Sequence, residues 1–258
     1  MKIATFNVNS IKARLPRVLE WLKEAAPDVA LLQETKCIDD AFPALEIEDL
    51  GYNVLTHGQK TYNGVALLSK RPIEDAACSL PGDRTDEQAR YVEATVGDLR
   101  IASIYLPNGN PVESDKYPYK LAWMDRLIRH VRDRLLPSEQ PFVLGGDYNV
   151  IPADLDVYNP KAWAEDALFR HETRSKFRAL IHLGLTEAWR ALHAESAYTF
   201  WDYQGGRWSR DEGLRIDHFL LSPGAADRLE ACEIDRGPRG RDKASDHTPV
   251  WCEIREAA

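Results

Sequence analysis

Polar and ionisable residues follow most of the apolar runs in this 258-residue sequence. Asn7 closes the first run, Glu34 closes DVALLQET, and Asp147 follows PFVLGG. Short apolar runs are typical of buried strands, and strands can hold the side chains at their ends rigidly against one edge of a sheet. We therefore expect one site that gathers seven residues: Asn7, Glu34, Asp147, Asn149, Asp217, Asp246 and His247. Tyr105 also stands near the end of an apolar run.

These residue types suit phosphoryl chemistry that depends on a divalent cation. Glu34 and Asp246 offer hard carboxylate oxygens of the kind that Mg²⁺ binds. Asp147 could orient an attacking water, while His247 could present a cationic imidazole to a phosphoryl oxygen with Asp217 holding the ring. Each residue alone also has a plain structural interpretation, and Asp217 with His247 could be a buried ion pair that only joins two strands.

Apolar strands alternate with amphipathic helices along the chain. Strands are predicted over residues 2–9, 28–35, 64–70, 99–106, 141–146, 214–222 and 248–254. Helices are predicted over residues 14–26, with Pro16 in the first turn, over residues 120–136, before Pro137, and over residues 177–185. No linker interrupts this pattern, so we expect a single α/β domain that covers residues 1–258.

Composition and charge narrow the class of protein. The 44% hydrophobic and 29% charged residues are close to ordinary globular usage. A net charge of −8 argues against a highly basic nucleic-acid binder, but it does not exclude a DNA enzyme because a metal site needs carboxylates. We see no signal peptide, no membrane-spanning run and no paired cysteine motif, so we expect a cytoplasmic protein with reduced cysteines.

Eight strings of the sequence together resemble the exonuclease III family of the endonuclease/exonuclease/phosphatase superfamily. In chain order they are TFNVNSIKARL, LLQETK, YNGVALLSK, YLPNGNP, LGGDYNV, YTFWDY, GLRIDHFLLS and SDHTPVW. The family includes bacterial exodeoxyribonuclease III and the class II abasic-site endonucleases, and the resemblance runs from Lys2 to about Ile254. It implies a DNase I-like α/β fold, a four-layer sandwich in which two central mixed β-sheets are flanked by helices.

The resemblance also adds Tyr105 to the predicted site as its eighth member, and it implies a role for each residue. Tyr105 would contact the scissile phosphate as a phenolate or a proton donor, and Asp147 would generate or position the nucleophilic water. His247, oriented by Asp217, would stabilise a phosphoryl oxygen. Together with Asn149 these residues form the implied catalytic set. One or two ions of Mg²⁺ (or Mn²⁺) would be held mainly by Glu34, from an implied metal set of Asn7, Glu34, Asp147, Asn149, Asp246 and His247.

Loop residues next to the strand ends are the predicted DNA contacts. Lys36 follows Glu34 by two residues, so in a strand both side chains would point to the same side. Arg239 and Lys243 belong to a basic stretch that runs into the last site motif, and a solvated face is the alternative there. YTFWDY resembles the family segment that shapes a pocket for an extruded abasic sugar, although core packing is the alternative for Trp201. The predicted contacts are Asn9, Lys36, Tyr62, Asn108, Phe200, Trp201, Leu214, Arg239 and Lys243.

The sequence therefore predicts a Mg²⁺-dependent DNA-repair nuclease that acts by in-line attack of water on phosphorus. The expected activities are those of a 3′→5′ exodeoxyribonuclease, an abasic-site endonuclease and a 3′-phosphatase or 3′-phosphodiesterase. A monomer would act on double-stranded DNA with abasic sites, nicks or recessed 3′ ends. A sphingomyelinase or inositol-phosphate phosphatase of the same superfamily is the second hypothesis. A non-catalytic nucleic-acid-binding module is the third, although it would be expected to lack a metal ligand or the histidine.

Overall fold

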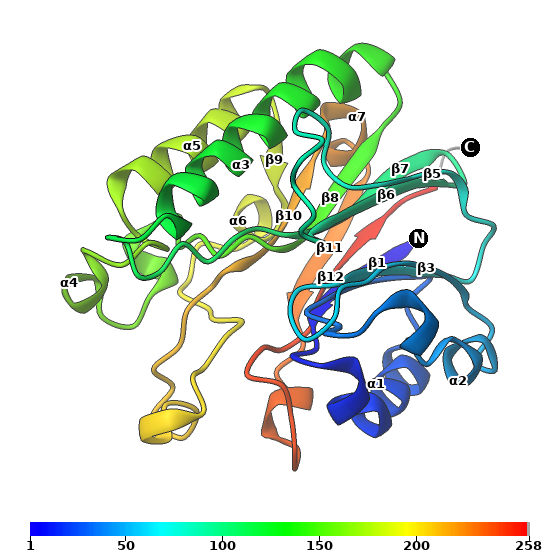
Figure 1. The fold of residues 1–258 in the computed structure, drawn as a ribbon, viewed down its shortest axis with the longest axis horizontal. Coiled ribbons are helices and arrows are strands. Elements are labelled where there is room, and N and C mark those ends of the chain that lie inside the picture. Colours follow the sequence, from blue (N-terminus) through cyan, green and yellow to red (C-terminus); the bar gives the residue numbers. More distant parts are fainter. Residues whose placement is uncertain (257–258) are drawn as a thin grey trace.

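Two six-stranded sheets form the centre of the computed structural model, which describes residues 1–256 (Figure 1). The first sheet has the order β11-β12-β1-β2-β4-β3 and the second has the order β5-β6-β7-β8-β10-β9. The strands of the first sheet are β1 Lys2–Asn7, β2 Val29–Gln33, β3 Asn53–His57, β4 Val65–Ser69, β11 Leu229–Ile234 and β12 Val250–Ile254. Those of the second are β5 Glu74–Cys78, β6 Tyr91–Val96, β7 Leu99–Tyr105, β8 Phe142–Asp147, β9 Thr186–Glu187 and β10 Asp217–Leu221.

Helices cover the outer face of each sheet. Trp21 of α1 and Ile47 of α2 pack on the first sheet, and Trp123 of α3 and Phe177 of α5 pack on the second (Figure 1). The predicted four-layer α/β sandwich is therefore confirmed. The helices are α1 Ile11–Ala25, α2 Ala44–Glu48, α3 Lys116–His130, α4 Pro160–Trp163, α5 His171–His182, α6 Ala188–Leu192 and α7 Pro223–Ala226. Within residues 1–256, none of them is long and apolar enough to cross a membrane.

The inner faces of the two sheets meet in a largely apolar core. Leu31 and Leu67 of the first sheet pack in one buried cluster with Val143 and Phe219 of the second. Close approach of the sheets requires a residue without a side chain at Gly145, because a Cβ there would lie 2.7 Å from Leu31 Cδ1 and 2.4 Å from the Phe219 ring. Gly145 of LGGDYNV therefore serves the packing of the two sheets, and β8 ends two residues later at Asp147.

Each sheet contains one parallel pair of strands, and these pairs determine where polar side chains meet. Strands β1 and β2 are parallel with Asn7 opposite Gln33, and β7 and β8 are parallel with Tyr105 opposite Asp147. Parallel strands end on the same side of a sheet, so the residues that follow them are brought together. The two pairs belong to packed sheets, and their carboxyl ends lie beside one another.

The predicted strands are confirmed to within a few residues at each end, but the helices begin earlier than predicted. Helix α1 starts at Ile11 because the Ser10 hydroxyl accepts a hydrogen bond from Ala13 N, so Pro16 lies beyond the first turn. Helices α3 and α5 start at Lys116 and His171, four and six residues before the predicted starts. Their first turns are polar, and hydrophobic spacing gives no signal there.

Candidate active site

The polar strand ends lie in one cavity of about 270 Å³. Asp147 ends β8, Asp217 begins β10 beside it, and the two residues are paired across the strands. Six of the eight predicted site residues line this cavity, and the other two bond directly to residues that do: Asn7 to Glu34 and Asp147, and Asp217 to His247. The lining includes Glu34, Tyr105, Asn108, Asp147, Asn149, Phe200, Leu214, Asp246 and His247. The residues that were predicted from the sequence to form one site therefore lie together in the structure.

Asn7 joins carboxylates from the two sheets. Its Nδ2 atom donates to Glu34 Oε1 and to Asp147 Oδ2, each over 2.9 Å, and its Oδ1 atom accepts from Asn9 N. The side chain is fully buried. Because both amide hydrogens are used, Asn7 holds Glu34 and Asp147 at a defined separation. Its amide oxygen is occupied by a backbone donor, so the geometry supports positioning of the carboxylates more directly than ligation of a metal ion.

His247 and Asp217 form a buried pair that a threonine completes. His247 Nδ1 lies 2.9 Å from Asp217 Oδ2, and Thr199 Oγ1 donates to the same oxygen over 2.6 Å. Burial would lower the pKa of His247, but Asp217 and Asp147 raise it to about 10. The ring is therefore an imidazolium at neutral pH, with its Nε2 atom 3.7 Å from Asp147 Oδ2. A cation held in this way can stabilise negative charge on a phosphoryl oxygen.

The two principal carboxylates have opposite pKa shifts. Burial, together with nearby Asp217 and Glu34, raises the pKa of Asp147 to about 7. Burial opposes ionisation of Glu34 as well, but the Lys36 ammonium 2.8 Å from Oε2 and the amide of Asn7 lower its pKa below the ordinary value. Different environments thus leave Glu34 ionised while Asp147 can exchange a proton near neutral pH, which is the behaviour expected of a group that acts on water.

Tyr105 stands at the end of β7 with its ring beneath the Arg90 guanidinium, 4.7 Å from the ring centroid. Burial and the charge of Glu34 raise the pKa of Tyr105 well above its usual value. The hydroxyl is therefore protonated at neutral pH. Of the two roles that the family resemblance left open for Tyr105, the proton donor agrees with this electrostatic environment and the phenolate does not.

Two asparagines line the cavity, and a buried lysine bonds to the loops that carry them. Asn149 Oδ1 accepts from Asn108 Nδ2 over 3.0 Å, and Asn149 Nδ2 donates to Leu106 O. Lys120 Nζ donates to the backbone carbonyls of Asn149 and Asn108, over 2.6 and 3.0 Å. Lys120 is fully buried, and burial lowers its pKa to about 7. It holds the loops after β7 and β8 in fixed positions.

The aromatic segment after α6 contributes one side chain to the cavity and buries another. Phe200 lines the cavity with Leu214 and contacts the His247 ring edge-on at 5.0 Å. Trp201 is fully buried, packs against the Trp208 ring and donates its Nε1–H to Asp211. The prediction of Trp201 as a DNA contact is therefore wrong for its ring, since the side chain belongs to the interior.

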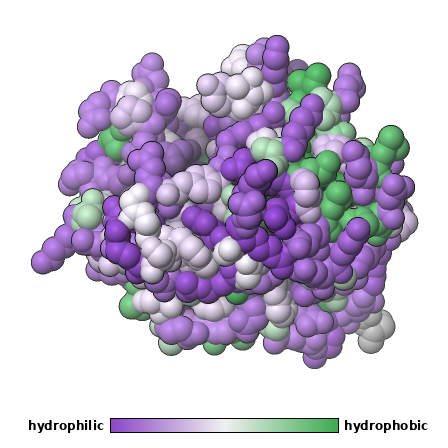
Figure 2. Space-filling view, turned by 90° about the horizontal axis from the view of Figure 1, so that it is seen from below, coloured by the Kyte–Doolittle hydropathy of each residue, from purple (hydrophilic) through white to green (hydrophobic). Residues whose placement is uncertain are grey.

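The other predicted DNA contacts differ in exposure. Tyr62 is 69% exposed, whereas Arg239 is only 8% exposed and donates to Trp201 O. Lys36 Nζ donates to Asn9 Oδ1 and pairs with Glu34, which lines the cavity. The loops near residues 204–206 and 238–240 extend to the lower side of the molecule in Figure 1, and the face seen from that side is mostly hydrophilic (Figure 2).

The donor set fits a hard divalent cation. Among residues 1–256, Glu34, Asp147 and His247 each offer a ligand atom within 4.8 Å of the others. Asp246 lines the same cavity but stands outside this group, and its Oδ1 atom accepts from Asn9 Nδ2. Carboxylate oxygens are the ligands that Mg²⁺ prefers, and an imidazolium has no free lone pair to offer. Glu34 and Asp147 are therefore the best-placed ligands.

Three further residues act in this site and were not predicted from the sequence. Thr199 supports Asp217, Lys120 holds the two asparagine loops, and Ser245 donates to Asn7 O over 2.7 Å. Each makes its bond to a residue distant in the chain. The only sequence signal was the position of Thr199 inside YTFWDY and of Ser245 inside SDHTPVW, since Lys120 has the spacing of an ordinary helix residue.

Comparison with known proteins agrees with this fold and this site. The Endonuclease/Exonuclease/phosphatase family matches residues 4–247. The chain is 33% identical over 268 residues to exodeoxyribonuclease III of Haemophilus influenzae, covering 99% of this chain and 100% of that protein. It superposes with a TM-score of 0.96 and 40% identity on the 3′ phosphatase NExo from Neisseria bound to a product DNA hairpin, covering 99% and 100% of the two chains. An AP endonuclease from Archaeoglobus fulgidus gives 0.94 and 36%, covering 98% and 99%.

A two-sheet sandwich with a carboxylate and histidine site at its strand ends defines a phosphoesterase-type hydrolase. The chain belongs to the endonuclease/exonuclease/phosphatase family, and within it to the branch that contains exodeoxyribonuclease III. The predicted family and the predicted fold are both confirmed.

Proposed function

We propose that this protein is a divalent-cation-dependent DNA-repair nuclease with 3′→5′ exodeoxyribonuclease, abasic-site endonuclease and 3′-phosphatase activity. The observation that carries the proposal is the buried group in which Asn7 holds Glu34 and Asp147 beside the imidazolium of His247. This group combines anionic oxygens for a metal ion with a fixed cation for a phosphoryl oxygen. The names of the relatives support DNA as the substrate class. The relative named as a 3′ phosphatase supports DNA with a terminal phosphate as one of the substrates.

The residues of the site divide the work of hydrolysis. Asp147 orients the attacking water and accepts its proton. His247, held by Asp217, donates through Nε2 to a non-bridging oxygen as negative charge grows there. Tyr105 keeps its proton and is placed to donate toward the phosphate or the leaving oxygen. Asn149 orients water through the amide that Asn108 and Leu106 fix.

Glu34 and Asp147 would hold the cation, with Asn7 and Asp246 acting through hydrogen bonds or water. A bound Mg²⁺ or Mn²⁺ ion would supply positive charge to the phosphoryl oxygens and compensate the carboxylates. An excess of negative charge supports this proposal, because the cavity is lined by five carboxylates: Glu34, Asp147, Asp166, Asp202 and Asp246. Two cations lie against them, Lys36 beside Glu34 and His247 beside Asp147. The proposal allows for one or two ions, and Asn149 belongs to the residues that would hold the second.

The proposal also covers the domain organisation, the oligomeric state, the DNA contacts and the cellular compartment of the protein. One domain covering residues 1–258 would act as a monomer on double-stranded DNA with abasic sites, nicks or recessed 3′ ends. Asn9, Lys36, Tyr62, Asn108 and Lys243 would contact its backbone, and Phe200 with Leu214 would receive an extruded sugar. The four thiols, Cys37, Cys78, Cys232 and Cys252, are free, which supports action in the cytoplasm.

Cleavage of defined duplexes tests this function. Duplexes with a recessed 3′ end, a 3′-phosphate at a nick, or one abasic analogue are incubated with Mg²⁺, with Mn²⁺ or with EDTA. We expect cleavage in both metals and none in EDTA. Glu34→Gln keeps the shape of the side chain but removes its charge, so it should lower kcat by at least about 10²-fold.

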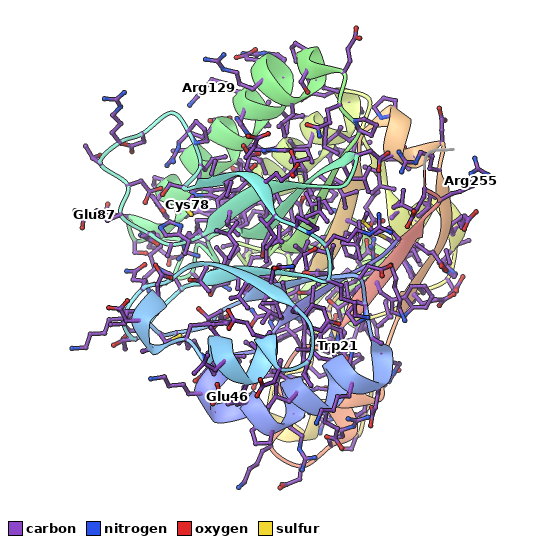
Figure 3. All side chains as sticks on the ribbon, turned by 90° about the vertical axis from the view of Figure 1, so that its right-hand side faces the viewer. Trp21, Glu46, Cys78, Glu87, Arg129 and Arg255 are labelled. Carbon is purple, nitrogen blue, oxygen red and sulfur yellow. The ribbon has the colours of Figure 1, made fainter. Side chains whose placement is uncertain are left out.

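The matched control is Glu46→Gln, which removes the same charge from the exposed face of α2 (Figure 3). It should cleave at the wild-type rate. Wild-type activity in Glu34→Gln would remove Glu34 from the proposed site. Failure of the wild type to cut any of the three duplexes, with hydrolysis of sphingomyelin or an inositol phosphate, would replace DNA with the second substrate class.

A further inference from the structure

Two of the four cysteines stand directly opposite one another in the first sheet. Cys232 of β11 and Cys252 of β12 are register partners in an antiparallel pair of strands, which lie side by side in Figure 1. Opposite residues of such a pair point to the same face of a sheet, and both cysteines belong to the buried core between the two sheets. Both thiols are free, and neither lines the candidate active site.

The hydrogen-bond pattern of the two strands determines how close these cysteines are. Asp235 N donates to Pro249 O over 2.9 Å, and the register of β11 and β12 places these two residues opposite one another, so they form a hydrogen-bonded pair. Such pairs alternate with non-hydrogen-bonded pairs along antiparallel strands, and Cys232 with Cys252 is therefore a non-hydrogen-bonded pair. Its Cα atoms are expected about 4.5 Å apart, within the range of about 4.4–6.8 Å that a disulfide bond spans.

The other two cysteines lack this arrangement. Cys78 of β5 stands opposite Val92 in the second sheet, and Cys37 lies in the loop after β2. Within residues 1–256, no strand pair except that of β11 with β12 places one cysteine opposite another. Cys37 and Cys78 therefore serve as an internal control for the behaviour of the opposed pair.

The thiols of the opposed pair are inert while the core is closed. Burial raises the pKa of both thiols, so they stay protonated at neutral pH, and the thiolate is the reactive form of cysteine. Access depends on β11, which is an edge strand paired with β12 on one side and has a bulge between Leu229 and Ala231. Proteins open locally, and an edge strand opens more readily than the centre of a sheet. Opening of β11 would give a small oxidant access to the pair.

We propose that Cys232 and Cys252 form a reversible intramolecular disulfide when the protein meets a two-electron oxidant of the peroxide class. The peroxide oxidises one thiol to a sulfenic acid and is itself reduced to water. The second thiol attacks that sulfur, its proton leaves with the sulfenic hydroxyl as a second water, and the S–S bond forms. A dithiol reductant reverses the reaction by thiol–disulfide exchange. This modification goes beyond the proposed function and does not depend on it.

The disulfide would restrain the segment that carries two residues of the candidate active site. Residues 235–249 join β11 to β12 and include Asp246 and His247. Thr248 Oγ1 donates to Asp235 O where the two strands diverge, and the disulfide would join the strands further from the site. A crosslink constrains the unfolded chain more than the folded chain, so the oxidised protein should be more stable. Because neither cysteine lines the cavity, kcat should be unchanged.

The test treats the full chain with hydrogen peroxide, removes the excess with catalase and counts free thiols in denaturant. We expect wild type to fall from four free thiols to two, and dithiothreitol to restore all four. Peptide mapping should find one crosslink, between Cys232 and Cys252, and oxidation should raise the Tm by about 5–10 °C. The control Cys37→Ala/Cys78→Ala should lose both of its thiols and show the same rise, whereas Cys252→Ala should form no such crosslink and show no rise.

Wild type that keeps four thiols, or that is oxidised only at Cys37 and Cys78, overturns the proposal. A crosslink that forms without raising the Tm overturns the stabilising effect. If Cys252→Ala does not fold, peptide mapping of the wild type still decides, because it needs no variant. None of these measurements uses DNA cleavage, so failure of the proposed function would leave their result unchanged.

Discussion

Replacement of His247 by alanine separates a catalytic role of this residue from a structural one. The His247 ring shares a buried 2.9 Å hydrogen bond with Asp217. Removing one partner of a buried ion pair leaves the other charge uncompensated, which costs roughly 3–5 kcal/mol of stability. Loss of a preorganised donor to the reacting oxygen lowers kcat by about 10²–10³-fold, equal to about 2.7–4 kcal/mol. We expect His247→Ala to show both losses.

The matched control is His130→Ala. His130 Nε2 lies 3.1 Å from Glu93 Oε2, and this buried pair joins α3 to β6 away from the candidate active site. Its loss should destabilise the protein to a comparable degree and leave kcat unchanged. The measurements are urea unfolding of all three proteins and single-turnover cleavage of a recessed 3′ end near neutral pH, under conditions in which each protein is folded.

Asp217→Asn tests whether the negative charge of Asp217 is needed for catalysis by His247. The amide keeps the size of the side chain but removes the anion that raises the pKa of His247, so kcat should fall while the fold is retained. The reasoning is refuted if His247→Ala loses as much stability as His130→Ala but keeps kcat within a few-fold of wild type. The imidazole would then only connect β10 to the segment before β12.

Three further changes have defined outcomes. Gly146→Ala should destabilise the protein by more than about 3 kcal/mol in urea unfolding, because a Cβ there would lie 1.9 Å from Ile104 O. Burial opposes ionisation of Glu93, but hydrogen bonds from His130 and other groups lower its pKa from 4.5 to about 2. About 3 kcal/mol of folding stability should therefore be lost as the pH falls from 4.5 toward 2. Acid unfolding should show a flatter pH dependence for Glu93→Gln than for wild type. Lys120→Met leaves the buried carbonyl of Asn149 unpaired, at about 1–3 kcal/mol, and frees the partly exposed carbonyl of Asn108. Steady-state kinetics should show a fall in kcat larger than the rise in KM.

The sequence predicted the central strands because they are buried on both faces and therefore continuously apolar. It missed β3, β5, β9 and β11 because these edge strands are partly exposed and have no such run. Strand β6 is buried but includes Glu93, whose charge is compensated by His130 and Arg100 from other elements. A local pattern cannot register a partner that lies elsewhere in the chain.

The sequence by itself identified the polar residues of the site, because each lies next to an apolar run that predicts a strand: Asn7, Glu34, Asp147, Asp217 and His247. Only the tertiary structure decided how they are connected. One amide of Asn7 bonds to carboxylates 27 and 140 residues away, and these contacts require two sheets to pack face to face.

Burial in the finished fold also decided which neighbouring residues can act. Trp201 and Phe200 are adjacent in one aromatic string, yet Trp201 lies in the interior and Phe200 lines the cavity. Thr199 and Lys120 became part of the site through bonds to distant atoms, which no spacing within the sequence announces. The sequence also shows that an aspartate stands at the end of a strand, but it does not show the pKa of that residue. Folding buries Asp147 among other carboxylates, and this desolvation and repulsion raise its pKa to about 7.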